Sequence, residues 1–156
     1  MTIASTVYSL LDRTAVEYDF LTHPRSATSS QTAQSAHVTG EQVAKAVVLK
    51  DSYGYVLAVL PATFEVELEV VSKELHRRLE FATEDELETL FHDCERGAIP
   101  PLGAAYGLPT VVDDVLCEQP DIYFEAGDHE RLVHVSETAF EKLVGDAEFF
   151  RFSSHR

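Results

Sequence analysis

The fold of this chain is decided by nine residues, Gln42-Val43-Ala44-Lys45-Ala46-Val47-Val48-Leu49-Lys50. The stretch is apolar at both odd and even positions, which is typical of a strand covered on both faces of a sheet. Because side chains alternate along a strand, Lys45 shares its face with the apolar residues Val43 and Val47. A lysine in that position must extend to water, lose its charge, or face a polar cavity that uses the charge. The stretch therefore predicts a central strand and makes Lys45 the first candidate for a functional residue.

The sequence that follows this strand predicts a mixed sheet. Residues 51–54 have a hairpin-turn pattern, and residues 55–60 form a second apolar strand that Pro61 ends. Residues 64–70 alternate apolar and acidic side chains, which predicts a half-exposed edge strand. Shorter strands are expected at residues 18–21, 81–82, 109–113, 122–126 and 131–135.

Five segments show helical periodicity or helix-capping patterns. They cover residues 5–18, 31–37, 72–79, 83–91 and 136–143. The fourth begins with a capping box at residues 83–86, and the fifth with Ser136. From Gly145 onward we expect a loosely held tail. Because strands outnumber helices, the sequence predicts an α+β fold, a mixed, curved or barrel-like sheet with helices packed outside it, as a single domain over residues 1–156.

The charge and the termini restrict the partners and the compartment. The formal net charge of −15 argues against DNA and against any broad binding of nucleic acid through its phosphates. The one basic cluster, residues 73–78, is either the solvated face of a helix or a phosphate contact. No apolar run is long enough to cross a membrane and no secretory signal is evident, so we expect a cytoplasmic protein. Cys94 and Cys117 fit free thiols in that compartment better than a disulfide.

Most familiar catalytic patterns are missing from the sequence. The histidines show no metal-ligand spacing, and no Cys-x-x-Cys, Gly-x-Ser-x-Gly, Walker or dinucleotide-binding pattern occurs. We therefore expect no metal. His23 precedes Pro24, and it either lines a site or is an exposed turn residue. Asp128 and His129 lie in a predicted turn, where charged residues need no special cause.

One further segment, Gly97-Ala98-Ile99-Pro100-Pro101-Leu102-Gly103, is suited to shaping a pocket. Its prolines restrict the backbone, and its flanking glycines permit unusual dihedral angles or a close approach. The segment is either a rigid pocket wall or a plain connecting loop. As a pocket wall beside Lys45, it would supply backbone amide donors next to one cation, a combination that suits an ester carbonyl or a phosphate. No general base is evident for such a site.

Five segments resemble the YbaK family in order and spacing; this family includes the editing insertion domain of bacterial prolyl-tRNA synthetases and its free-standing relatives. The segments are residues 42–51, 57–61 and 97–103, Asp113, and residues 123–127. The most specific combination is the lysine strand followed some fifty residues later by Gly-x-x-Pro-Pro. The resemblance extends from about residue 23 to residue 143. It implies a mixed β-barrel flanked by helices and the hydrolysis of wrongly charged aminoacyl-tRNA without a metal or other cofactor.

The same resemblance implies roles for individual residues. The functional lysine of the family matches Lys45, which would bind the terminal nucleotide region of the substrate. The family loop that lines the aminoacyl pocket matches Gly97, Ala98, Ile99, Pro100, Pro101 and Gly103. Further substrate-binding positions are expected at His23, Ala46, Gly127 and His129. In this family the terminal ribose hydroxyl of the tRNA is thought to help activate the attacking water.

These features support one leading hypothesis and two alternatives. The leading hypothesis is a free-standing, metal-independent trans-editing hydrolase that deacylates mischarged aminoacyl-tRNA. It would bind the acceptor end of the tRNA, and an aminoacyl-tRNA synthetase could supply further affinity for the tRNA. The first alternative, which the strong acidity favours, is a non-catalytic binding module that senses an aminoacyl or nucleotide group or docks on a synthetase. The second is a hydrolase that acts on a small ester or nucleotide conjugate.

Overall fold

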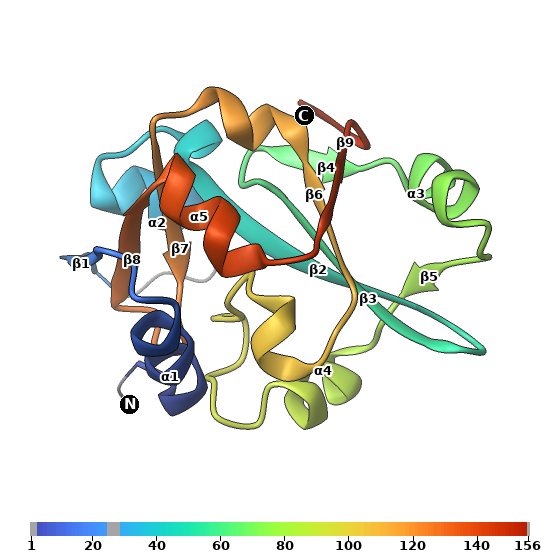
Figure 1. Cartoon of the computed structure of the whole chain (residues 1–156), viewed down its shortest axis with the longest axis horizontal. Helices are drawn as coiled ribbons and strands as arrows, with labels where there is room; N and C mark the ends of the chain where they lie inside the picture. Colours follow the sequence, from blue (N-terminus) through green and yellow to red (C-terminus); the bar gives the residue numbers. More distant parts are fainter. Residues whose placement is uncertain (1–2, 25–28, 156) are drawn as a thin grey trace.

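A mixed sheet of eight strands forms the centre of the computed structural model, which describes residues 3–24 and 29–155 (Figure 1). In spatial order its strands are β1 (Asp19–Thr22), β8 (Arg131–Ser136), β7 (Asp121–Glu125), β2 (Val43–Asp51), β3 (Gly54–Pro61), β6 (Thr110–Asp113) and β9 (Glu148–Phe150), and β5 (Glu80–Phe81) also pairs with β2. Strand β2 pairs antiparallel with β3 and parallel with β7, while β6 pairs parallel with β3 and with β9. The predicted α+β fold with a mixed sheet is therefore confirmed.

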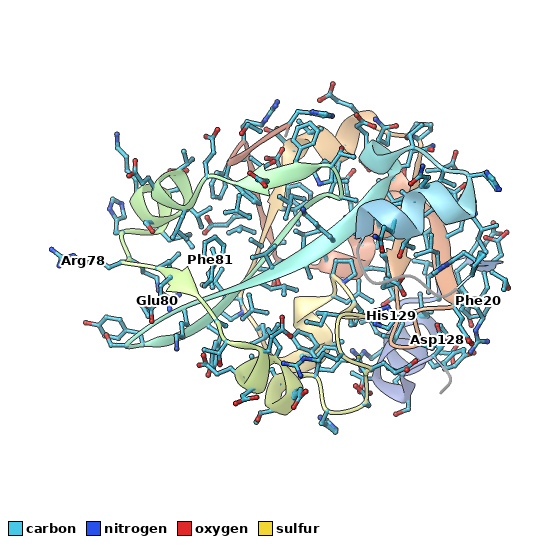
Figure 2. All side chains as sticks on the ribbon, turned by 180° about the vertical axis from the view of Figure 1, so that it is seen from behind. Phe20, Arg78, Glu80, Phe81, Asp128 and His129 are labelled. Carbon is cyan, nitrogen blue, oxygen red and sulfur yellow. The ribbon has the colours of Figure 1, made fainter. Side chains whose placement is uncertain are left out.

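Helices pack outside the sheet, as predicted. They are α1 (Ser5–Thr14), α2 (Ser29–Ala36), α3 (Leu68–Leu75), α4 (Glu84–Leu90) and α5 (Glu137–Val144), with short 3-10 helices η1 (Gly40–Gln42), η2 (Gly103–Tyr106) and η3 (Asp114–Glu118). Helices α1 and α5 lie on one face of the sheet and α2 lies on the other (Figures 1 and 2). Across the described parts of the chain, no helix is both long enough and apolar enough to span a membrane.

The caps that the sequence predicts are present. The hydroxyl of Thr83 accepts a hydrogen bond from the backbone N–H of Glu86, and the Glu86 carboxylate accepts one from the backbone N–H of Thr83. The hydroxyl of Ser136 accepts a hydrogen bond from the N–H of Ala139 at the start of α5. Helix α1 is shorter than predicted, because Ala15 adopts a left-handed conformation (φ 57°) and ends it there.

The central hairpin agrees with its sequence pattern. Strands β2 and β3 pair along their whole length, from Ala44 opposite Pro61 to Asp51 opposite Gly54. The even-numbered residues of β2, such as Ala44 and Val48, belong to the main core, which also contains buried side chains of α1 and α5. The apolar odd-numbered residues of β2 point to the other face of the sheet, where they join two smaller hydrophobic clusters. Val43 packs under α2, whereas Leu49 packs under α3.

The predicted edge strand over residues 64–70 is wrong beyond its first three residues. Strand β4 covers only Phe64–Val66, and helix α3 begins at Leu68. The alternation of apolar and acidic residues hid a second period, because Leu68, Val71 and Leu75 are spaced three and four residues apart on one helical face. Val71 is fully buried, so the helical period is the one that the core uses. The helix predicted over residues 72–79 accordingly begins earlier and ends at Leu75.

The prediction of a loosely held C-terminal tail is also wrong. Strand β9 pairs with β6, and strand β10 (Ser153–His155) pairs with β4. Phe152, which lies between β9 and β10 in the sequence, is fully buried. The buried carboxylate of Asp113 accepts hydrogen bonds from the backbone N–H groups of Phe152 and Ser153 and from the Ser153 hydroxyl. The tail is held by a partner about forty residues away in the sequence, which no local pattern reveals.

A histidine fastens the edge strand β1 to its neighbours. The imidazole of His134 lies between two carboxylates, with Nδ1 at 2.7 Å from Asp19 Oδ1 and Nε2 at 2.8 Å from Asp121 Oδ1. It also stacks on the ring of Tyr123. Partial burial acts to lower the pKa of His134, but the hydrogen bonds with Asp121 and Asp19 outweigh it and the pKa is raised.

We predict that this contact stabilises the protein at acidic pH and less so at alkaline pH. Because the pKa of His134 is higher in the folded protein, its contribution is complete below its unfolded pKa and is lost as the pH rises through the folded value. His134→Gln should therefore lower the melting temperature at pH 5.5 by an amount that corresponds to roughly 1 kcal/mol. At pH 9 the difference in melting temperature between the wild-type protein and His134→Gln should be smaller. An equal difference at both pH values would show that the contact is not ionic.

Candidate functional site

The candidate site begins where strands β2 and β7 stop pairing. Their parallel ladder joins Val43 to Tyr123 and Ala44 to Phe124, and it ends there. The next residues along the two strands are Lys45 and Glu125. Since residues paired in register point to the same face of a sheet, Lys45 and Glu125 both belong to the face that carries Val43 and Tyr123. Helix α2 covers this face, with Ala33 and Ala36 packed against it.

Lys45 is partly buried and lies between the two small clusters of its face. Its Nζ donates a hydrogen bond to the backbone carbonyl of Ala62 at 3.1 Å. The side chain also lines an open groove with Val47, Glu65, Val66 and Phe81. Figure 2 shows Phe81 and Arg78 at one end of the molecule and His129 toward the other, with the β2–β3 hairpin running between them. Of the three possibilities for a lysine in this strand, the structure supports a side chain that reaches a solvent-accessible groove.

Glu125 is a buried carboxyl group that the sequence analysis missed. Its side chain is 7% exposed, accepts a hydrogen bond from the hydroxyl of Thr32 at 3.2 Å and has Oε1 3.5 Å from Nε2 of His23. Burial raises the pKa of Glu125 to about 7, against the hydrogen bond from Thr32, and the charges of Asp128 and Glu95 raise it further. An acidic residue at the end of an apolar strand, directly before Ala126 and Gly127, was the available signal.

His23 is buried, with 4% of its surface exposed, so the interpretation as an exposed turn residue is wrong. Its Nδ1 lies 2.7 Å from the backbone carbonyl of Pro24. A carbonyl oxygen only accepts hydrogen bonds, so Nδ1 carries a proton and Nε2 is directed at Glu125. The Pro24 carbonyl thus holds one ring nitrogen, while the other faces the Glu125 carboxyl group without a hydrogen bond to any described residue.

The turn between β7 and β8 is more than a solvated connection, because Asp128 and His129 are 1% and 8% exposed. Asp128 Oδ1 accepts hydrogen bonds from the backbone N–H groups of Glu130 and Arg131, and Oδ2 accepts one from the Arg131 guanidinium at 3.0 Å. Gly127 adopts φ 115°, and a Cβ at this position would lie 3.2 Å from the backbone nitrogen of Ala4. Only glycine fits this position without strain.

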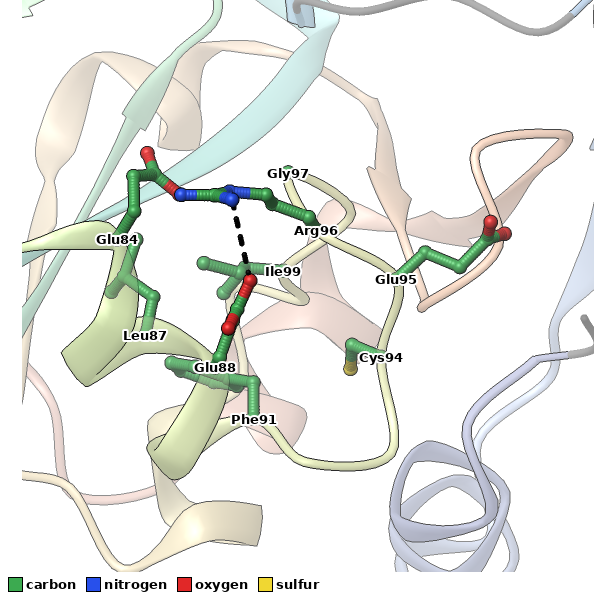
Figure 3. Close-up of a pocket in the computed structure, with 9 residues that line it drawn as sticks. All are labelled: Glu84, Leu87, Glu88, Phe91, Cys94, Glu95, Arg96, Gly97 and Ile99. Atoms are coloured by element: carbon green, nitrogen blue, oxygen red, sulfur yellow. Dashed lines mark hydrogen bonds and ion pairs between the residues drawn. The ribbon is translucent and has the colours of Figure 1, made fainter.

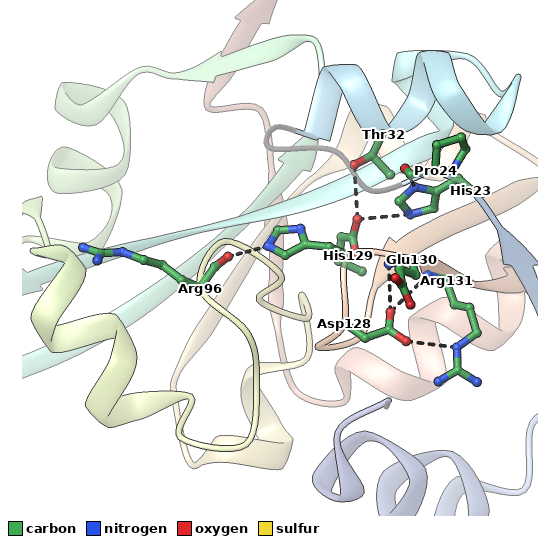
Figure 4. Close-up of polar contacts among 9 residues, drawn as sticks. His23, Pro24, Thr32, Arg96, Asp128, His129, Glu130 and Arg131 are labelled. Carbon is green, nitrogen blue, oxygen red and sulfur yellow. Dashed lines mark hydrogen bonds and ion pairs between the residues drawn. The ribbon is translucent and has the colours of Figure 1, made fainter. Parts of the chain in front are cut away.

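The same turn holds the start of the 97–103 loop. Nε2 of His129 hydrogen-bonds to the backbone carbonyl of Arg96, and the carbonyl of Gly127 accepts a hydrogen bond from the N–H of Glu95 at 2.8 Å. Figure 4 shows His129 pointing toward Arg96, away from His23. The His129 backbone has φ 60°, which is uncommon for a residue with a side chain. These contacts make the turn and the loop one connected unit.

The loop itself forms one wall of a narrow pocket against α4. Gly97 and Ile99 line this pocket together with Leu87 and Phe91, and Arg96 crosses its mouth to make ion pairs with Glu84 and Glu88 (Figure 3). Within the loop, Ala98 and Pro100 are buried, as are Pro101, Leu102 and Gly103. A Cβ at Gly103 would lie 1.9 Å from Oγ1 of Thr110, so a close approach requires this glycine. The interpretation as a rigid pocket wall therefore agrees with the structure better than a plain connection.

We predict that His129→Ala loosens the 97–103 loop. The carbonyl of Arg96 would lose its side-chain donor, and alanine would keep the unfavourable positive φ. The expected loss of stability is roughly 1–2 kcal/mol in urea unfolding. Amide hydrogen exchange in residues 97–103 should become faster. The matched control is His92→Ala at an exposed position, and equal effects of the two substitutions would contradict the prediction.

The structure links some of the predicted site residues and leaves others apart. His23, Gly127, His129 and the 97–103 loop are linked through Glu125 and Arg96, and Lys45 shares the sheet face of Glu125. The side chain of Ala46 packs against the main core, on the opposite face of β2 from Lys45. The pocket of the 97–103 loop and the groove of Lys45 share no lining residue. The roles of these residues toward a substrate remain predictions.

One group of described residues has side chains close enough to hold a metal ion. Cys117, Glu137 and Glu141 place their ligand atoms within 4.8 Å of one another. Burial and the hydrogen bond with Glu141 raise the pKa of Glu137 to about 7. Cys117 and Glu141 are exposed, so the group lacks the enclosure of a structural metal site.

Several solved structures share this fold. A hypothetical protein, APE2540, is 17% identical, with a TM-score of 0.84 over 96% of this chain and 100% of its own. A candidate trans-editing enzyme for prolyl tRNA synthetase is 21% identical, with a TM-score of 0.81 over 96% of this chain and 95% of its own. A candidate signal transduction protein from Marinobacter aquaeolei VT8 is 22% identical, with a TM-score of 0.77, and this chain spans 31% of it. At these identities the likeness shows the fold alone.

The sequence itself also has a match. Among curated proteins, none matches the chain significantly. Residues 23–143 match the family model of the aminoacyl-tRNA editing domain, and this range contains Lys45, the 97–103 loop, Glu125 and His129. The match covers more than three quarters of the chain and agrees with the resemblance seen in the sequence. The chain therefore belongs to the aminoacyl-tRNA editing domain family.

Proposed function

We propose that the protein is a free-standing deacylase that hydrolyses mischarged aminoacyl-tRNA in trans. The observation that carries the proposal is Lys45, a partly buried lysine at the end of the β2–β7 ladder and inside the range that matches the editing-domain family. A cation in an otherwise apolar strand is costly unless its charge is used. The terminal phosphate and the ester of an aminoacyl-tRNA are groups that such a charge would stabilise.

The remaining predicted residues would shape the amino-acid end of the site. Most of the 97–103 loop is buried, and His129 anchors its start, so it has the rigidity that discrimination between amino acids needs. The proposal needs neither a metal nor another cofactor. The net charge of −15 means that broad contacts with tRNA phosphates are few. A synthetase that presents the acceptor end would remove this difficulty and is the partner that we propose.

The test is a panel of tRNAs, each charged correctly and incorrectly, incubated with the purified protein. We expect rapid loss of the amino acid from one or two mischarged species and little loss from correctly charged ones. Turnover of a minimal aminoacyl-nucleotide, insensitive to salt and without preference for tRNA, would instead support a small-ester hydrolase. Uniform background rates across the panel would reject the proposed hydrolysis.

The strong acidity favours one other function, a binding module that senses an aminoacyl or nucleotide group or docks on a synthetase. The two functions differ in whether the protein turns over charged tRNA. Saturable binding of a non-hydrolysable aminoacyl-adenosine analogue, together with no turnover of any charged tRNA, would identify the binding module. Binding accompanied by turnover identifies the deacylase.

A further inference from the structure

Phe81 is a large apolar side chain that the core does not cover. Among the described residues, three large apolar side chains are exposed, and they are Tyr53, Phe81 and Phe149. A single exposed phenylalanine needs no special explanation. Phe81 is 55% exposed, however, and it lines the same open groove as Lys45, the residue on which the proposed function depends. The ring is therefore placed where a substrate bound at Lys45 could reach it.

The pairing of β5 with β2 fixes Phe81 on the sheet face of Lys45. Phe81 lies opposite Leu49, and residues opposite each other in an antiparallel pair point to the same face of the sheet. Leu49 in turn shares its face with Lys45, four residues earlier on the same strand. The N–H of Ala82 donates a hydrogen bond to the carbonyl of Val48 at 3.0 Å and holds β5 in this position. At the usual rise per residue, Phe81 lies roughly 13 Å along β2 from Lys45.

The lining of the groove beyond Lys45 suits a nucleobase better than a phosphate. The groove has a volume of about 340 Å³, and Val47 and Val66 supply apolar surface between Lys45 and the Phe81 ring. Glu65 also lines it, and a carboxylate there disfavours a phosphate but accepts hydrogen bonds from the amino group of cytosine or adenine. Aromatic rings bind bases that are outside a duplex by stacking on them. An exposed ring, apolar walls and one acceptor are the features of such a base-binding groove.

Two nearby cations, Lys50 opposite β5 and Arg77 just before it, are engaged within the protein. The ammonium group of Lys50 lies 2.8 Å from a carboxylate oxygen of Glu86, and the guanidinium of Arg77 lies 2.6 Å from one of Asp51. The net charge of the chain is −15. A nucleic acid that crosses this end of the protein would therefore be held by stacking more than by contacts to its phosphates.

We propose that Phe81 is a stacking platform for an unpaired base of the tRNA acceptor end. This inference rests on the proposed deacylase function and deepens it, because it gives the path of the acceptor strand over the protein. His129, which anchors the predicted amino-acid pocket, lies toward the opposite end of the molecule from Phe81 (Figure 2). The strand would thus direct its amino acid toward His129, place its terminal phosphate at Lys45 and run along β2 to Phe81. The stacked base is one that precedes the terminal adenosine.

The first test measures the binding of an RNA hairpin that carries a fluorescent label and ends in the unpaired nucleotides ACCA, by fluorescence anisotropy. Phe81→Ala should weaken binding by about 5- to 100-fold, because stacking of one base on one aromatic ring contributes an effect of that order. Phe81→Tyr keeps an aromatic ring and should bind within about twofold of the wild-type protein. Phe81→Leu is apolar but has no ring, so it should bind as weakly as Phe81→Ala.

The matched control is Phe149→Ala. Phe149 is also an exposed phenylalanine, but it lies on β9 and does not line the groove. This variant should bind the hairpin as the wild-type protein does, and thermal unfolding of each variant verifies that the fold is intact. The ratio of affinities between wild type and Phe81→Ala should be the same at low and high salt, because stacking releases no counterions. An unchanged affinity for Phe81→Ala, or an equal loss for Phe149→Ala, would overturn the inference.

The second test locates the stacked base. An abasic nucleotide replaces each unpaired base of the hairpin in turn, and each hairpin is measured with the wild-type protein and with Phe81→Ala. At one position before the terminal adenosine, loss of the base should weaken binding to the wild-type protein as much as Phe81→Ala does. The same abasic hairpin should then bind Phe81→Ala with no further loss, because the two changes remove one contact. Coupling at the terminal adenosine alone, or at no position, would overturn the proposed path.

Hydrolysis of mischarged tRNA is measured on the same variants, so that this inference and the proposed function can fail separately. If the wild-type protein is active and Phe81→Ala is equally active below saturation, only the inference fails. If the wild-type protein binds the hairpin through Phe81 but hydrolyses no charged tRNA, the deacylase function fails and the groove is an RNA-binding site. If Phe81→Ala weakens binding of a synthetase and leaves binding of the hairpin unchanged, the ring contacts a protein partner and the inference is overturned.

Discussion

Replacing Lys45 with alanine is expected to lower the rate of aminoacyl-tRNA hydrolysis by about 100-fold or more while the protein stays folded. The ammonium group lies on the sheet face of Glu125 and lines a groove open to solvent. Without this ammonium group, the negative charge that develops on the ester and the charge of the terminal phosphate both lose the cation that would stabilise them. The expected loss of stability is about 1 kcal/mol for the hydrogen bond to the carbonyl of Ala62 that disappears.

The matched control for this prediction is Lys50→Ala. Lys50 lies on the same strand but on the opposite face, and its ammonium group binds the carboxylate of Glu86 at 2.8 Å. Removing it changes the net charge of the protein by the same amount as Lys45→Ala. Single-turnover hydrolysis of a mischarged tRNA should be slow for Lys45→Ala and close to wild type for Lys50→Ala. Equal rates for all three proteins would remove Lys45 from the mechanism.

The largest effect on stability is expected for Asp113→Ala. The Asp113 carboxylate is fully buried and accepts hydrogen bonds from the N–H groups of Val115, Phe152 and Ser153 and from the Ser153 hydroxyl. Alanine would leave these buried donors without their acceptor, so the free energy of unfolding should fall by roughly 3–5 kcal/mol. Strand β10 and the end of β9 should then exchange their amide hydrogens quickly.

Asp114→Ala serves as the control, because the neighbouring Asp114 is exposed. Urea unfolding of both variants measures the difference. A loss of less than about 1 kcal/mol for Asp113→Ala would show that water replaces the carboxylate at little cost. The account of the C-terminal segment as an integral part of the sheet would then be wrong.

The parts of the fold that the sequence predicted correctly are those with local causes. The β2–β3 hairpin follows from two apolar runs on either side of a turn pattern, and the starts of α4 and α5 follow from Thr83 and Ser136. Each of these depends on residues within a few positions of one another. The α+β class follows from them, because strands joined by tight turns form a sheet and the amphipathic helices bury their apolar faces against it.

The parts that it predicted wrongly depend on distant partners or on two competing periods. Residues 64–70 satisfy a strand period through alternation and a helical period through Leu68 and Val71, and only the core around Val71 decides between them. The C-terminal residues show no strong pattern, and Asp113 holds them through contacts formed in the folded chain. Neither outcome can be derived from nearby residues.

The candidate site was predicted in outline but without its buried acid. Lys45 and the 97–103 loop stand out because a charge in a strand and paired prolines are visible in the sequence. Glu125 closes a strand in which a single acidic residue is unremarkable, and His23 precedes a proline as exposed histidines often do. Their significance depends on burial and on the 3.5 Å approach of the two side chains, which the fold alone creates.

The most direct test of the central claim is the single-turnover hydrolysis of mischarged aminoacyl-tRNA, measured beside the correctly charged form of the same tRNA, with the protein in excess. If the protein is a trans-editing deacylase, at least one mischarged species should lose its amino acid faster than its correct counterpart by about tenfold or more, and Lys45→Ala should abolish the difference. Background rates for every mischarged species, with the protein folded, would contradict the account.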